Sequence, residues 1–221
     1  MARILVACEF SGIVRDAFAA LGHDAWSCDL EPSERPGQHV QGDVLTLLRE
    51  PWDLMIAHPP CTYLCNSGAR WWAKRQEEQR DALDFVRTLL DAPIPRIALE
   101  NPEGKISTAV RPSDQTIQPW MFGEDASKAT ALWLKNLPRL LQTRILDASR
   151  MRCRFCRAIF PAHYGLYGCA CLSGYMAQPI YANQTPSGQN KLGNTKTRAR
   201  ERSRTYQGIA AAMAAQWGTF L

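Results

Sequence analysis

The sequence predicts an α/β fold built around a parallel sheet, and three features lead to this prediction. Short apolar runs occupy residues 3–8, 52–57 and 95–99, as is typical of strands buried on both faces of a sheet. Between them, apolar residues recur with helical spacing over residues 13–21 and 83–90. Strands that alternate with helices favour a parallel sheet. The 221 residues suit one such domain with an appendage.

The N-terminal stretch predicts the first half of a nucleotide-binding unit. Residues 3–8 predict a central strand, residues 9–12 a turn, and residues 13–21 a helix that Gly22 ends. A strand, a tight glycine turn and a helix in this order form half of a nucleotide-binding βαβ unit. The turn holds a single glycine, so the generic dinucleotide fingerprint is absent.

Two aspartates follow this unit, and the first lies at a position that suits a nucleoside. Residues 24–28 predict the second strand, which ends on Asp29, and a carboxylate there can accept hydrogen bonds from both ribose hydroxyls. Asp43 lies in the next turn, within residues 40–44. The alternative for each aspartate is an ordinary turn or cap residue.

Cys61 is the candidate nucleophile. It follows the apolar run 52–57 and the stiff pair Pro59-Pro60, which places it at the carboxyl end of a strand, where open α/β sheets bind ligands. A soft nucleophile held in a fixed direction is what a covalent catalyst needs. The alternative is a buried structural cysteine after a turn.

A second candidate group ends the next strand. Residues 95–99 predict that strand, and Glu100, Asn101 and Pro102 follow it. The carboxyl end of this strand should lie beside the end of the strand that precedes Cys61. A capping role is the alternative for Glu100.

These motifs resemble those of one enzyme family. Pro59-Pro60-Cys61 is similar to the catalytic motif of DNA cytosine-5 methyltransferases, and Glu100-Asn101-Pro102 resembles their Glu-Asn-Val motif. Phe10-Ser11-Gly12 resembles the turn that holds S-adenosylmethionine, although Val14 stands where a second glycine is usual. Residues 204–217 resemble the C-terminal pattern of compact, phage-type members, with Gly208-Ile209-Ala210 in place of Gly-Asn-Ala.

The resemblance implies a Rossmann-like, S-adenosylmethionine-dependent methyltransferase fold. It also implies that a cytosine leaves the DNA duplex, that Cys61 bonds to its C6 atom, that Glu100 contacts N3, and that Asn101 holds the loop. The expected cofactor-binding residues are Phe10, Ser11, Gly12, Asp29, Asp43 and Pro59.

Charge is divided unevenly along the chain. Residues 1–134 carry 13 Lys and Arg against 19 Asp and Glu, whereas residues 135–221 carry 13 against 2. A basic C-terminal part on an acidic core suggests a polyanionic partner, and we expect double-stranded DNA. The alternative is a solvated basic surface.

Four cysteines cluster within the basic part. Cys153, Cys156, Cys169 and Cys171 form a CxxC and a CxC pair, twelve residues apart, which predicts a tetrahedral structural zinc site. His163 can replace one thiol as a ligand. Free thiols, an iron–sulfur cluster or disulfides are the alternatives.

We therefore expect a cofactor-binding and catalytic domain over residues 1–134, a basic target-recognition and zinc module over 135–204, and a C-terminal helix over 205–221. No membrane-spanning run and no signal peptide is recognisable, so a cytoplasmic location in a bacterium or phage-infected host is expected. No membrane or obligate protein partner is expected.

Two other functions stay open: the same fold acting on another nucleic acid or with a modified donor, and a catalytically idle, zinc-containing DNA-binding protein.

Overall fold

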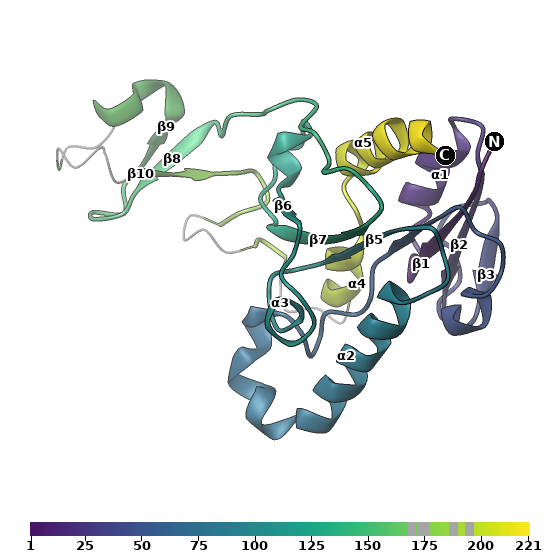
Figure 1. The fold of residues 1–221 in the computed structure, drawn as a ribbon. Coiled ribbons are helices and arrows are strands. Elements are labelled where there is room, and N and C mark those ends of the chain that lie inside the picture. The colour runs from purple at the N-terminus through teal and green to yellow at the C-terminus, as the bar shows by residue number, and fades with distance from the viewer. Residues whose placement is uncertain (168–170, 172–176, 186–189, 193–196) are drawn as a thin grey trace. The chain divides into compact units, whose positions relative to one another are not determined.

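The computed structural model describes residues 1–167, 171, 177–185, 190–192 and 197–221. Its centre is a seven-stranded sheet with the order β3-β2-β1-β4-β5-β7-β6 (Figure 1). The first five strands in this order run parallel, and β7 is antiparallel to both of its neighbours. The predicted α/β fold and parallel sheet are confirmed. The strands are β1 (Arg3–Ala7), β2 (Asp24–Asp29), β3 (His39–Gln41), β4 (Leu54–Ala57), β5 (Arg96–Asn101), β6 (Gln115–Ile117) and β7 (Thr130–Lys135).

Helices cover both faces of this sheet. The alternation of side chains along each strand sends Leu5, Met55 and Ile97 into one core, together with Leu83 and Val86 of α2. On the other face α1 packs against α5, as Figure 1 shows. The helices are α1 (Ile13–Ala19), α2 (Gln76–Leu90), α3 (Ile106–Ala109), α4 (Arg198–Ser203) and α5 (Gln207–Trp217).

The segment before α2 has a structure of its own. Residues Asn66–Lys74 form a 3₁₀ helix, η2, and α2 begins only at Gln76. Trp71, within η2, is 49% exposed and does not belong to the core.

The C-terminal helix α5 is firmly attached to the parallel-sheet domain. Met213 and Trp217 are fully buried, and the indole N–H of Trp217 donates to the carbonyl of Pro138 at 3.0 Å. Just before the helix, Arg204 pairs with Glu34 through two hydrogen bonds of 2.7 and 2.9 Å.

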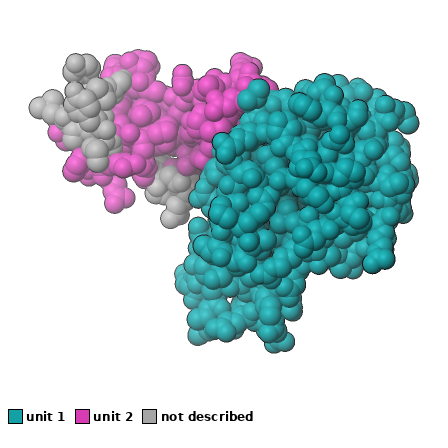
Figure 2. All heavy atoms as spheres, in the orientation of Figure 1, with its two compact units in different colours: residues 1–117, 129–141, 203–221 teal, residues 118–128, 142–202 magenta. Residues whose placement is uncertain are grey.

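The chain forms two compact units, coloured separately in Figure 2. Unit 1 comprises residues 1–117, 129–141 and 203–221, and unit 2 comprises residues 118–128 and 142–202. Unit 2 contains a small antiparallel sheet of β8 (Arg150–Cys153), β9 (Ile159–Pro161) and β10 (Ala177–Ile180), with β8 in the middle. The predicted functional division at residues 134 and 204 stays a prediction. Among the described helices, none combines the length and apolar character needed to cross a membrane.

Candidate functional site

The centre of the sheet creates a crevice at the carboxyl ends of its strands. From β1 the chain proceeds outward through β2 and β3, whereas β4 and β5 extend in the opposite direction. Ligands bind at such a switch point in open α/β sheets. A cavity of about 580 Å³ lies there, lined among others by Cys8, Asp29, Asp43 and Pro60.

This cavity is acidic, and we call it the acidic cavity. Four carboxylates line it, those of Asp29, Asp43, Glu78 and Asp81, and no Lys or Arg is among its described lining residues. Burial, and then the charge of Asp29, raise the pKa of Cys8 to about 12, so this thiol stays neutral. A cavity of this charge favours a cationic ligand.

Both predicted nucleoside-binding aspartates line the cavity and also stabilise local turns. One carboxylate oxygen of Asp29 accepts from the backbone N–H of Glu31 at 3.0 Å. Asp43 caps the 3₁₀ helix Val44–Leu47 by accepting from the N–H of Leu45 at 2.9 Å. Both aspartates therefore do stabilise turns, and these hydrogen bonds fix the direction of each carboxylate beside the cavity.

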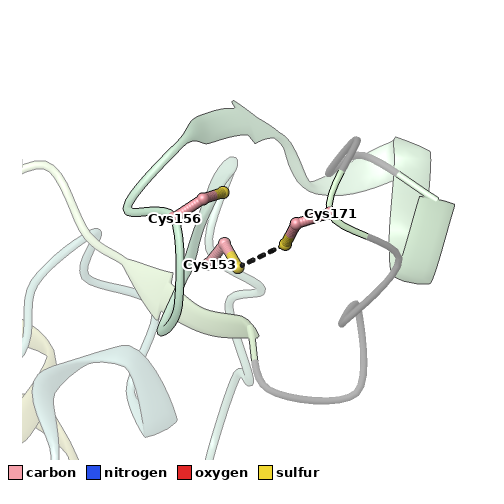
Figure 3. Close-up of side chains that lie close together, drawn as sticks. All are labelled: Cys153, Cys156 and Cys171. Carbon is pink, nitrogen blue, oxygen red and sulfur yellow. Dashed lines mark hydrogen bonds between the residues drawn. The ribbon is translucent and has the colours of Figure 1, made fainter.

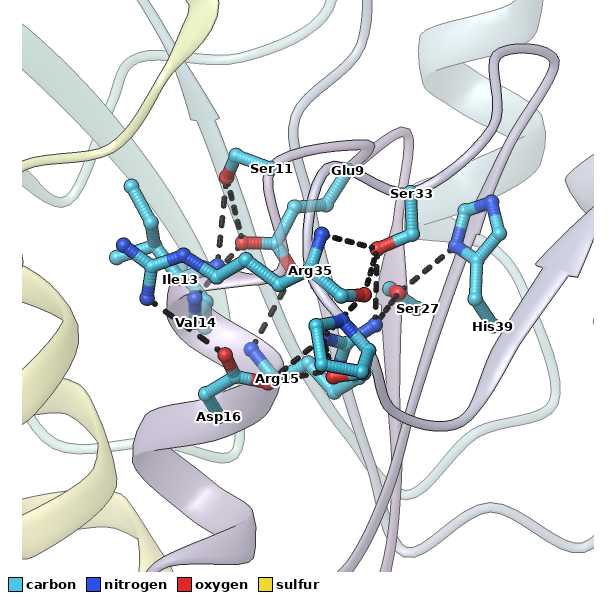
Figure 4. A network of polar contacts seen from close by, with 11 residues as sticks. Glu9, Ser11, Ile13, Val14, Arg15, Asp16, Ser27, Ser33, Arg35 and His39 are labelled. Atoms are coloured by element: carbon cyan, nitrogen blue, oxygen red, sulfur yellow. Dashed lines mark hydrogen bonds and ion pairs between the residues drawn. The ribbon is translucent and has the colours of Figure 1, made fainter.

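The first turn contains an acidic residue whose role the sequence analysis missed. Glu9 is buried, and its Oε1 accepts from the N–H of Val14 at 2.7 Å and from the hydroxyl of Ser11 at 3.2 Å (Figure 4). Its Oε2 accepts from the N–H of Arg15 at 3.2 Å. The Glu9 carboxylate thus caps the N-terminus of α1, where the helix dipole is positive. The sequence does contain an indication of this role, because Glu9 is an acidic residue at the start of the glycine turn that precedes a predicted helix.

The predicted turn residues Phe10, Ser11 and Gly12 are buried around Glu9 and are not among the residues that line the acidic cavity. Gly12 has φ of 71°, and a side chain there would meet the guanidinium of Arg15. Arg15 is itself almost fully buried, and its Nη1 donates to the hydroxyls of Ser27 and Ser33 (Figure 4). The turn is therefore packed by its own residues.

The ends of β4 and β5 are fastened to each other by two side-chain contacts. His58 Nδ1 lies 3.3 Å from Oε2 of Glu100, and Asn101 donates through Nδ2 to the carbonyl of Pro59 at 2.8 Å. These contacts hold the segment that leads to Cys61 beside Glu100. β4 and β5 are paired in parallel, so the predicted adjacency of the two strands is confirmed. Pro59 is buried, and its neighbour Pro60 lines the acidic cavity.

Two enclosed polar atoms remain at this junction. His58 Nε2 and Asn101 Oδ1 have no hydrogen-bond partner within the described part of the chain. Buried polar atoms are nearly always paired, so both atoms are available to hydrogen-bond a polar group that enters this junction.

After Cys61 the chain is basic and aromatic. The guanidinium of Arg75 lies 5.6 Å from the ring of Tyr63, and that of Arg70 lies 5.2 Å from the ring of Trp71. Tyr63 and Arg75, with both tryptophans of η2, line a second cavity of about 310 Å³. Cations and aromatic faces of this kind suit phosphates and unstacked bases.

Three of the four predicted zinc ligands come together in unit 2. The sulfur atoms of Cys153, Cys156 and Cys171 all lie within 4.8 Å of one another, as Figure 3 shows. Those of Cys153 and Cys171 are 3.4 Å apart. A tight turn follows β8, closed by the 2.9 Å bond from Cys153 N–H to the carbonyl of Ala158. Cys169, the fourth predicted ligand, lies outside the described residues.

No protein-family model and no curated protein matches this chain. Among solved structures, it is similar to a prophage-encoded E. coli protein to which DNA modification methyltransferase activity is attributed. The identity is 15% and the TM-score 0.45, and the match covers 67% of this chain and 53% of that one. This chain thus spans about half the length of that protein.

Proposed function

We propose that this protein is an S-adenosylmethionine-dependent DNA cytosine-5 methyltransferase. The observation that carries the proposal is the junction of β4 and β5, where two side-chain contacts hold the Cys61 segment beside Glu100 at the edge of the acidic cavity. A nucleophile, an acid and a cofactor-sized cavity at one switch point match the motifs that resemble this family.

The site fits a cationic donor better than a dinucleotide. A bound pyrophosphate needs the free N–H groups of the helix that follows the first strand. Here the carboxylate of Glu9 accepts from those of Val14 and Arg15, and it would repel a phosphate. S-adenosylmethionine carries a positive sulfonium and no phosphate, so it suits four carboxylates and an internally capped helix. It supplies an electrophilic methyl group.

The chain's own residues would then prepare the cytosine. C5 of cytosine is a weak nucleophile, and bonding of the Cys61 sulfur to C6 makes it enamine-like. Glu100 hydrogen-bonds or protonates N3 and so stabilises the charge that this addition generates. C5 could then take the methyl group from the bound donor; the C5 proton would pass to water, and the electrons of the C5–H bond would restore the C5–C6 double bond and expel the sulfur. Asn101 keeps the Cys61 segment in place through Pro59.

The reaction is tested by incubating DNA with the protein and S-adenosylmethionine labelled in its methyl group, and then analysing the nucleosides by mass spectrometry. We expect the label in 5-methyldeoxycytidine. Label in adenine or at the cytosine amino group would reject C5 chemistry, and incorporation into RNA alone would reject DNA as the substrate.

Asp29→Asn should weaken S-adenosylmethionine binding. The carboxylate accepts hydrogen bonds as a charged group, and such bonds contribute roughly 1.5–3 kcal/mol. Calorimetry should therefore show an affinity loss of about 10- to 150-fold. Asp91→Asn is the matched control, because Asp91 is exposed and does not line the acidic cavity. Equal affinities of the two variants would remove Asp29 from the binding site.

Unit 2 would bind zinc and help to hold DNA. The three described sulfurs lie close enough for one ion, and thiolate sulfur is a preferred zinc ligand. Arg150 and Arg152 lie on β8, the strand that ends at Cys153. Their charges can neutralise DNA phosphates.

Metal analysis should find about one zinc per chain in the reduced, purified protein. Cys153→Ser should lose the zinc, whereas Cys28→Ser in unit 1 should keep it, because Cys28 is far from the cluster in sequence and hydrogen-bonds to Gly42 instead. Removal of zinc should weaken DNA binding more than S-adenosylmethionine binding. A folded, DNA-binding protein without metal would favour free thiols.

A further inference from the structure

Cys65 lies one turn after Cys61 and faces it. The carbonyl of Cys61 accepts from the N–H groups of Leu64 and Cys65 at 3.0 and 3.1 Å. In such a turn, side chains four residues apart lie on the same side. The side chains of Cys61 and Cys65 are hydrogen-bonded to each other, and Cys65 Sγ also lies 3.0 Å from the hydroxyl of Ser67.

The surrounding backbone holds Cys65 in this position. Lys105 N–H donates to the carbonyl of Leu64 at 2.7 Å, and Asn66 N–H donates to that of Glu103 at 3.2 Å. Cys65 forms a β-bridge with Gly104, where any side chain would collide with the carbonyl oxygen of Leu64. The segment after β5 therefore clamps the turn that carries both cysteines.

The two thiols of this pair differ in acidity. The hydrogen bond from Cys61, supported by those from Ser67 and Gly68, lowers the pKa of Cys65 to about 5, although partial burial raises it. A thiol with its pKa lowered in this way is ionised at neutral pH, so Cys65 can act as a proton acceptor. Attack on C6 requires a thiolate, so Cys61 must lose its proton. The Cys65 sulfur is already hydrogen-bonded to Cys61 and can accept that proton.

We propose that Cys65 is the base that accepts the proton of Cys61 when the Cys61 sulfur bonds to C6 of the target cytosine. The S–H bond of Cys61 breaks, an S–H bond forms on Cys65, and the new S–C6 bond sends the electrons of the C5–C6 double bond into the ring. When the sulfur later leaves C6, it takes the proton back, so the pair is regenerated without another reactant. The proposal rests on the proposed methyl transfer.

Several other charged groups near this turn contact other partners. Arg70, Arg75 and Lys105 lie over aromatic rings, and His58 faces Glu100 across the strand ends; η2 also carries Lys74 in its last turn. Glu103, on the same segment, lies 3.1 Å from the hydroxyl of Thr116. The groups are Arg70 over Trp71, Arg75 over Tyr63, Lys105 over Trp72, and the His58–Glu100 pair.

The test is the pH dependence of kcat for 5-methyldeoxycytidine formation by the wild type and by Cys65→Ser. Serine retains the size and the hydrogen bonds of the side chain but is not ionised. The wild-type kcat should change little between about pH 6 and 8, because the base is already a thiolate. In the variant, Cys61 must ionise by itself, so kcat should rise about tenfold per pH unit towards the ordinary thiol pKa of about 8.5.

Profiles of the same shape in both proteins would overturn the role of Cys65, whereas a wild type that makes no 5-methyldeoxycytidine at any pH would reject the proposed function itself. A second measurement applies even if the variant fails to fold. Alkylation of Cys65 in the wild type by iodoacetamide, followed by peptide mapping, should proceed at nearly constant rate between about pH 6 and 8. A rate that rises about tenfold per pH unit would overturn the proposal.

Discussion

Cys61→Ser should abolish methyl transfer to DNA while leaving S-adenosylmethionine binding nearly unchanged. A serine hydroxyl is not ionised at neutral pH and is a far weaker nucleophile than a thiolate, so C6 is not attacked and C5 stays unreactive. Cys61 is not among the residues that line the acidic cavity, which is why cofactor affinity should survive. The loss should appear entirely in kcat, measured as labelled 5-methyldeoxycytidine.

Cys28→Ser is the matched control for this experiment. Cys28 is a buried thiol of the same unit whose sulfur donates to the carbonyl of Gly42 at 3.4 Å, a bond that serine can also make. Because Cys28 lines the acidic cavity, the comparison uses saturating S-adenosylmethionine, at which Cys28→Ser should retain most of the wild-type kcat. Turnover by Cys61→Ser at the level of this control would show that Cys61 does not carry the reaction.

Glu100→Gln should reduce kcat by roughly 10²–10⁴-fold, the usual contribution of a general acid. Glutamine has the same shape and can still contact His58 and the cytosine, but it has no acidic proton for N3. The Michaelis constants for DNA and S-adenosylmethionine should change much less than kcat, because the interaction strengthens mainly as C6 is attacked.

Glu103→Gln provides the comparison, since Glu103 is an exposed carboxylate only three residues further along and contacts Thr116. Its kcat should stay close to that of the wild type. A Glu100→Gln enzyme as active as Glu103→Gln would mean that N3 is stabilised by another group and that Glu100 only fastens β5 to β4.

The sequence was sufficient to predict the parallel half of the fold. The apolar runs before Glu9, Cys61 and Glu100 are continuous, because these strands are buried by helices on both faces, and all three form neighbouring parallel strands. The direction of β7 was not predictable, since an apolar run such as residues 130–134 contains no information about its partner's orientation. The α2 helix was placed by its periodicity, but its start was obscured by the aromatic residues of η2.

The candidate site was predicted in outline, through residues at or just after the carboxyl ends of strands; Glu100 and Asn101 are the last two residues of β5, whereas they were predicted to follow it. Asp29 and Asp43 line the acidic cavity because strand ends place them there. Glu9, His58 and Cys65 were missed, because their importance comes from contacts. Glu9 meets the start of α1, His58 meets Glu100 across 42 positions of sequence, and Cys65 meets Cys61 through a turn. The hydrophobic periodicity of the sequence gives no information about such side-chain contacts.

The most direct test of the central claim is covalent trapping with DNA that carries 5-fluorocytosine. Once C5 has accepted the methyl group, fluorine cannot leave it as a proton would, so the sulfur stays bonded to C6. Incubation with S-adenosylmethionine should give a protein–DNA adduct whose digested peptide carries the modified base on Cys61. Absence of an adduct from active, folded protein, or an adduct on Cys65 instead, would contradict Cys61 as the nucleophile.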